Sequence, residues 1–166
     1  MPTDPVHISG DTLSATVAPL GAEMQTLRTA EGADLLWHGD PQWWSGRSPI
    51  LFPIVGRAAD DRIAVGDFET GMKQHGFARR ALFTLDAHDA RSCRFTLRDS
   101  DETRAVWPFA FGIAVTHAFA GDTLEVAVEI SNDDAEPMPF GFGFHPAFAW
   151  PLPGGAGKPH EITLAN

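Results

Sequence analysis

The chain has 166 residues, a formal net charge of −10 and 43% hydrophobic residues. This length fits one domain with a substantial core, and the hydrophobic share is too high for a disordered chain. The 22 acidic residues outnumber the 12 basic ones, and no Lys/Arg cluster offsets them, so we expect binding to neither nucleic acids nor anionic membranes. No apolar run approaches the roughly 20 residues that a membrane helix needs.

The single cysteine, Cys93, has no partner for a disulfide within this sequence. It lies in SCRFTL on the apolar side of an alternating run with Phe95 and Leu97, which predicts a buried free thiol. The opening residues, MPTDPVHISG, lack the basic region and the apolar stretch of a signal peptide. These features predict a protein of the reducing cytoplasm.

The chain shows the pattern of short strands separated by turns. In chain order, the predicted strands are residues 6–9, 12–18, 22–29, 34–40, 49–55, 62–69, 77–87, 92–99, 109–119 and 123–130. The last two form the clearest hairpin, and His117 lies on its apolar face. Only DETRAVW, residues 101–107, has the pattern of a helical turn, which Pro108 ends. The sequence therefore predicts an all-β chain, an antiparallel β-sandwich in a single domain over residues 1–166.

Residues 139–148 read PFGFGFHPAF, in which phenylalanine and glycine alternate up to a histidine. Successive side chains of a strand point to opposite faces. One face would carry Phe140, Phe142 and Phe144, and the other Gly141, Gly143 and His145. We predict that the phenylalanines pack in the core. The opposite face, without side chains beside an imidazole, makes room for a ligand or for a close backbone.

Two further stretches carry candidate polar groups. GRSPILFPIVGR, residues 46–57, is an apolar strand between Arg47 and Arg57, and KQHGFARR, residues 73–80, places His75 before a glycine. Surface cations and a solvated histidine would be the ordinary interpretation. The seven histidines show no H-x-H or H-x3-H spacing and there is one cysteine, so no metal site is predicted. Acid/base chemistry by histidines, with arginine orienting a polar ligand, fits the pattern better.

Taken in order, RSPILFPIVGR, KQHGFARR, the Trp-Pro-Phe before the hairpin and FGFHPAFAWP resemble the aldose 1-epimerase (galactose mutarotase-like) family, and within it the LacX-type branch. The resemblance covers residues 6–154. It implies a large antiparallel β-sandwich, called a supersandwich. Its members interconvert the α and β anomers of free or phosphorylated aldoses without a cofactor, so the implied partner is a hexose or a hexose phosphate.

The resemblance also implies roles for particular residues. The family's general acid maps onto His145, its sugar-pocket histidine onto His75, and its sugar-binding arginine onto Arg57. Arg79 of HGFAR is a further candidate, and Gly143 belongs to the glycine wall along which a sugar ring would approach. Arg62, in the string DRI, takes the place of Arg57 if the alignment shifts by a few residues.

The chemistry of mutarotation requires groups of these kinds. The ring oxygen must gain a proton while the anomeric hydroxyl loses one, and a histidine can give and retake a proton near neutral pH. Arginine offers fixed donors to sugar hydroxyls or to a phosphate. Trp43, Trp44 and Trp107 are candidates either for stacking on a sugar face or for burial in the core.

One departure from the family limits this interpretation. The family's general base is a glutamate on a strand well C-terminal to the histidine of the H-P strand, and nothing between Pro146 and Asn166 resembles that strand. We expect the chain to correspond to the N-terminal part of the family domain. A non-catalytic carbohydrate-binding sandwich and a structural interaction sandwich remain alternatives. Unpaired strand edges predict self-association into a homo-oligomer.

Overall fold

The computed structural model describes residues 4–164, and its regular structure is almost entirely β-strand, as predicted. In chain order the strands are β1 (Val6–Ser9), β2 (Leu13–Ala18), β3 (Glu23–Thr29), β4 (Ile50–Leu51), β5 (Arg62–Val65), β6 (Phe68–Gly71), β7 (Thr84–His88), β8 (Ser92–Arg98), β9 (Phe111–Ala120), β10 (Thr123–Asn132) and β11 (Gly143–Phe144). Helical turns occur at α1 (Asp101–Arg104), Ala59–Asp61 and Ala78–Arg80. Within residues 4–164, no helix is long and apolar enough to cross a membrane.

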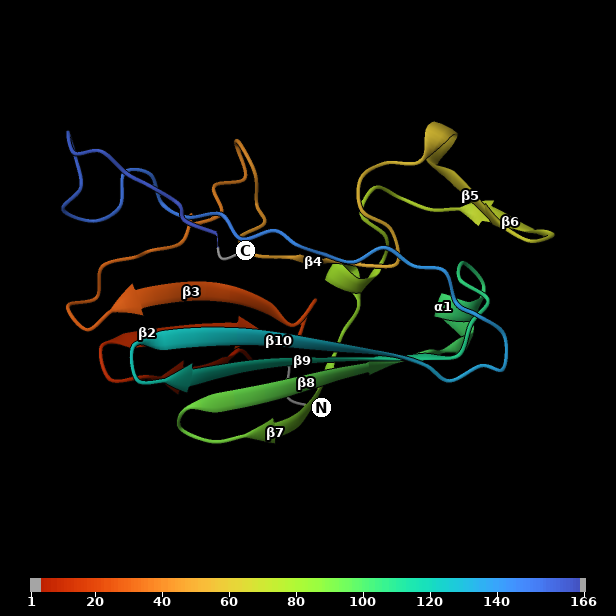
Figure 1. Cartoon of the computed structure of the whole chain (residues 1–166), viewed down its shortest axis with the longest axis horizontal. Coiled ribbons are helices and arrows are strands. Elements are labelled where there is room, and N and C mark those ends of the chain that lie inside the picture. The colour runs from red at the N-terminus through yellow and green to blue at the C-terminus, as the bar shows by residue number, and fades with distance from the viewer. Residues whose placement is uncertain (1–3, 165–166) are drawn as a thin grey trace.

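Two antiparallel sheets form the main sandwich (Figure 1), one in the order β1-β2-β3 and the other in the order β10-β9-β8-β7. The sheets are joined at their edges, where the Ser9 N–H donates to the Ala90 carbonyl at 2.9 Å. The core cluster includes Ile8, Ala15, Val17, Phe95, Ile113 and Val115. Burying one large apolar side chain contributes about 1.5–3 kcal/mol, so this cluster stabilises the pairing of the two sheets.

The hairpin of β9 and β10 follows its predicted pattern. The strands pair from Thr123 with Ala120 at the turn to Asn132 with Phe111 at the far end. Residues 111–115 of β9 are all buried, burial alternates from there to Phe119, and His117 is 1% exposed. The prediction of a histidine on the apolar face of this hairpin is therefore confirmed.

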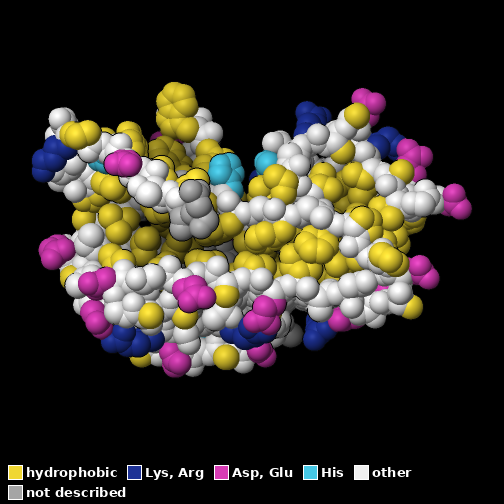
Figure 2. Space-filling view, in the orientation of Figure 1, with side chains coloured by type: hydrophobic (Ala, Val, Ile, Leu, Met, Phe, Trp, Pro, Cys, Tyr) yellow, Lys and Arg dark blue, Asp and Glu magenta, His cyan; other side chains and the backbone are white. Residues whose placement is uncertain are grey.

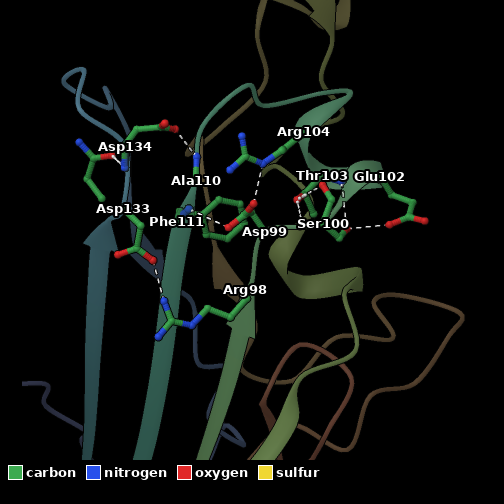
Figure 3. Close-up of polar contacts among 11 residues, drawn as sticks. Arg98, Asp99, Ser100, Glu102, Thr103, Arg104, Ala110, Phe111, Asp133 and Asp134 are labelled. Atoms are coloured by element: carbon green, nitrogen blue, oxygen red, sulfur yellow. Dashed lines mark hydrogen bonds and ion pairs between the residues drawn. The ribbon is translucent and has the colours of Figure 1, made fainter.

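Polar contacts fix the loop that joins β8 to β9 (Figure 3). The Ser100 side chain accepts from the Thr103 N–H at 3.4 Å, and the Ser100 N–H donates to the Thr103 side chain at 2.8 Å, which caps α1. Arg104 Nε donates to Asp99 Oδ2 at 2.6 Å. The helical turn predicted in DETRAVW is confirmed, and the chain leaves it through Trp107, which is buried.

Above the sandwich in Figure 1, β4 runs antiparallel to β11, with Gly143 paired to Leu51 and Phe144 to Ile50. The β5–β6 hairpin projects beside them. Residues 62–69 were expected to form one strand, and that prediction is wrong. Gly66, with a φ of 57°, turns the chain between β5 and β6 instead.

The prediction that Phe140, Phe142 and Phe144 pack in a core is also wrong for this chain. Their side chains are 48%, 37% and 38% exposed. The physical reason is that β11 has two residues and, among the residues described, pairs with β4 alone, so that no further layer covers it. Figure 2 shows a broad apolar area on the face of the molecule that it draws.

Candidate functional site

His145 lies directly after β11, and its side chain is exposed. The backbone N–H of His145 donates to the Pro49 carbonyl at 3.1 Å, and the backbone N–H of Ala147 donates to the Arg47 carbonyl at 2.8 Å. These bonds extend the β4–β11 pairing past the regular ladder. The backbone around the histidine is therefore fixed, while the imidazole itself remains open to a ligand.

His75 is held in an unusual backbone conformation. Its φ is 66°, and the following Gly76 has a φ of 70°. A left-handed conformation is uncommon for a residue other than glycine, and such outliers are concentrated at functional sites. Two hydrogen bonds to Gly56 support this conformation. The backbone N–H of His75 donates to the Gly56 carbonyl at 2.8 Å, and the backbone N–H of Gly56 donates to the ring atom Nδ1 of His75 at 3.0 Å. In neutral His75 the remaining proton is therefore on Nε2.

The fold brings the two histidines together. The ring centroids of His75 and His145 are 6.4 Å apart, with the planes inclined at 61°. Trp44 stacks on the His145 ring from a third segment, at a centroid distance of 5.0 Å. Histidine side chains (cyan) are visible beside the hollow at the top of the face drawn in Figure 2.

The charge state of His75 follows from its surroundings. Partial burial lowers the pKa of His75, and the nearby charges of Arg79, His145 and Arg80 lower it further. The neutral form of His75 is thus favoured, with its Nδ1 lone pair committed to Gly56 and its Nε2 atom 3.2 Å from the side-chain amide nitrogen of Gln74. Within residues 4–164 no group of three His, Cys, Asp or Glu side chains is arranged to hold a metal ion.

Arg79 is an arginine near this pair, and one of its donor atoms has no partner among the residues described. It lies in the helical turn Ala78–Arg80, and Nη2 donates to the Gln74 carbonyl at 3.2 Å. Its Nε atom is buried and has no hydrogen-bond partner. Burial, followed by the charge of Arg80, lowers the pKa of Arg79, and Glu23 acts in the opposite direction.

The other two candidate arginines are held in ion pairs. Arg57, whose side chain is 66% exposed, donates from Nε and Nη2 to the Asp61 carboxylate at 2.7 and 2.8 Å. Arg62 Nε donates to Glu69 Oε1 at 2.9 Å across the β5–β6 hairpin. The structure thus gives both guanidinium groups a partner other than the two histidines.

Glu23 is a residue that the sequence analysis did not single out. One carboxylate oxygen accepts both the Arg47 N–H at 2.7 Å and the Ser48 N–H at 2.9 Å. The Ser48 hydroxyl, which is buried, donates to the Met24 carbonyl at 2.7 Å. Together these bonds hold the segment before β4 against β3, and this segment in turn binds the backbone of His145. No spacing in the sequence indicates that link.

The remaining candidates have separate surroundings. A Cβ on Gly143 would lie 3.2 Å from side-chain atoms of Leu51 and Val55, so apolar side chains fill the space beside this glycine. A role for Gly143 in sugar binding stays a prediction. Trp107 is buried in the core, whereas Trp43 is 75% exposed.

The chain belongs to the aldose 1-epimerase family, whose family model matches residues 5–166. It is 30% identical over 153 residues to the plasmid-encoded protein LacX of Lactococcus lactis, covering 89% of this chain and 51% of that protein. It is 27% identical over 136 residues to a putative glucose-6-phosphate 1-epimerase of Escherichia coli, covering 76% of this chain and 43% of that one.

A solved structure has the same fold. It is described as a galactose mutarotase related enzyme from Lactobacillus acidophilus, with a TM-score of 0.86 and 34% identity, and the match covers 89% of this chain and 50% of that one. The expected mutarotase-like sandwich is confirmed by this match. The chain spans about half the length of the relatives it matches.

Proposed function

We propose that this chain carries the proton-donating and sugar-orienting part of an aldose 1-epimerase site. His145 would protonate the ring oxygen of the sugar, which allows the ring to open. The observation that supports this assignment is the meeting of His75 and His145, with ring centroids 6.4 Å apart, at an exposed position of the fold.

The two histidines have different surroundings, which suits them to different tasks. The lowered pKa of His75 favours its neutral ring, so His75 adds no positive charge at the site. Its Nδ1 already accepts the Gly56 N–H. His75 would therefore donate a hydrogen bond from Nε2 to a sugar oxygen, while His145 transfers the proton to the ring oxygen.

Arg79 would bind the substrate through its uncommitted donors. The buried Nε atom is shielded from a ligand, so the terminal Nη groups of the guanidinium would donate to a sugar oxygen or a phosphate. Because one relative is described as a putative glucose-6-phosphate 1-epimerase, a hexose phosphate is proposed as a substrate class beside a free hexose. Arg57 is the second candidate, and it would first have to release Asp61.

The group that takes the proton from the anomeric hydroxyl is not assigned to a residue of this chain. A positioned acid or base typically contributes about 10²–10⁴-fold to a rate. We expect the chain by itself to mutarotate weakly and to keep its sugar contacts.

Polarimetry tests the proposal with α-D-glucose and α-D-galactose, compared with the spontaneous rate. We expect an acceleration that His145→Ala abolishes and that His7→Ala, which alters an exposed histidine on β1, leaves unchanged. Calorimetry with the same sugars and a hexose 6-phosphate measures binding. Binding without any acceleration would favour the carbohydrate-binding alternative, and absence of both would contradict the proposal.

A further inference from the structure

Trp44 lies against the histidine to which we assign the proton transfer. The indole and the His145 imidazole are stacked, with centroids 5.0 Å apart and planes inclined at 30°. A stacked aromatic partner restricts rotation of an exposed imidazole and occupies one of its faces. The histidine is then left with its ring edge and its other face for a ligand.

Hydrogen bonds fix the backbone of the loop that carries Trp44. The Trp43 and Trp44 N–H groups both donate to the Asp40 carbonyl, at 3.0 and 2.9 Å, and close a turn. The Trp44 carbonyl accepts the Trp37 indole N–H at 2.7 Å. This side chain therefore sits on a backbone that is fixed on both sides of the residue.

Gly46 supplies the space that the indole needs. A Cβ at this position would lie 2.6 Å from Cζ2 and 2.7 Å from Cε2 of Trp44. Real Cβ atoms essentially never approach so closely, so a side chain at position 46 would displace the ring. The backbone of Gly46 thus supports one part of the indole while His145 stacks on the ring.

We propose that Trp44 is a positioning residue for His145, which holds the imidazole edge toward the sugar. The inference rests on the proposed function, because orientation matters for turnover only if His145 contacts substrate. It differs from a sugar-stacking role, since the part of the indole that faces His145 is already covered. Small displacements of a reacting group can lower a rate strongly.

Nuclear magnetic resonance tests the stack without requiring turnover. The His145 ring-proton signals, identified by their loss in His145→Ala, should be shielded by the indole. Trp44→Leu should shift them downfield, Trp44→Phe should shift them less, and Gly46→Ala should reproduce the effect of Trp44→Leu. Trp43→Leu is the matched control, because it removes an exposed neighbouring indole. Gly71→Ala is the control for the added methyl, because the nearest atom to its Cβ would be 3.9 Å away.

Kinetics then separate positioning from substrate binding. We expect Trp44→Leu to lower kcat by about tenfold with little change in KM, and Trp44→Phe to restore most of the rate. Unmoved His145 signals in Trp44→Leu would overturn the proposal, as would a raised KM with kcat unchanged. If Trp44→Leu does not fold, Gly46→Ala and Trp44→Phe decide the same question. Should His145→Ala leave turnover intact, the proposed function fails, whereas the resonance shifts still decide whether the stack exists.

Discussion

The imidazole Nε2 of His117 lies 3.1 Å from the carbonyl oxygen of Ala22, which belongs to the chain entering β3. The other ring nitrogen, Nδ1, is buried and has no hydrogen-bond partner. Burial lowers the pKa of His117 to about 4, with the bond to Ala22 acting weakly in the opposite direction. A proton on Nδ1 would leave a charged donor unsatisfied inside the core.

This arrangement predicts a pH-dependent free energy of unfolding. Between about pH 6.5 and pH 4 the unfolded chain binds a proton at His117 that the folded chain does not, so stability falls as the pH falls through this range. Each pKa unit corresponds to about 1.4 kcal/mol, which makes the loss about 3 kcal/mol. Urea unfolding at a series of pH values measures it. His117→Gln should flatten the dependence, and His88→Gln, at an exposed position, should not.

A second prediction compares the candidate arginines. Arg79→Ala should weaken binding of a hexose 6-phosphate by about 1.5–3 kcal/mol, the range for hydrogen bonds to charged groups. Arg57→Ala should cost less, since its guanidinium is held by Asp61. Calorimetric titration of both variants decides between them. A larger loss in Arg57→Ala would show that this ion pair opens on binding and that Arg57 is the main sugar contact.

Glu23 carries a third prediction, which concerns stability. Glu23→Ala removes the acceptor of two backbone N–H groups and should lower the free energy of unfolding by about 1–3 kcal/mol. Glu23→Gln keeps an acceptor oxygen and should lose less. Chemical denaturation is the measurement, with Glu125→Ala on the exposed side of β10 as the control. Equal stability of Glu23→Ala and the control would mean that water replaces the carboxylate at no cost.

The thiol of Cys93 provides a fourth test. Burial raises its pKa to about 11, and the thiolate is the form that reacts with disulfide reagents. The folded chain should therefore resist labelling near pH 8 and become reactive once it is denatured. Rapid stoichiometric labelling of the folded chain would show that the core around β8 opens readily.

The fifth prediction concerns association. The exposed side chains of Phe142 and Phe144 form part of an apolar face, and such faces associate in water. The net charge of −10 opposes self-association, so added salt should strengthen it by screening the repulsion. Sedimentation velocity in low and high salt tests this. The double variant Phe142→Ser, Phe144→Ser should remain monomeric in both, and persistent association would direct attention to the strand edges.

The sequence predicted the local elements better than their environment. Alternation in β9 and β10 and the helical turn that Pro108 ends are short-range signals, and both the hairpin and α1 form as expected. Alternation in residues 140–145 shows which side chains share a face, but cannot show whether another layer covers that face. For the same reason the phenylalanines were wrongly placed in a core.

In the candidate site, too, the sequence indicated the individual residues but not their tertiary contacts. Spacing alone could not bring His75 and His145 together, and the family resemblance supplied that pairing. The partners of Arg57 and Arg62 depend on the turn at residues 59–61 and on the β5–β6 hairpin, whose geometry the sequence pattern did not indicate. The link from Glu23 to the segment before β4 joins residues far apart in the chain, and only the fold reveals it.

Gly76 is under the strictest local constraint near the site. A Cβ there would overlap the carbonyl group of Phe52, and the backbone has a φ of 70°. The same Phe52 carbonyl accepts the Phe77 N–H at 3.0 Å, so the turn that carries His75 is attached to the chain following β4 at this point. In a library containing all substitutions, position 76 should therefore tolerate almost no replacement. A single methyl group added at position 76 would therefore displace the turn that holds His75 and move this histidine away from His145.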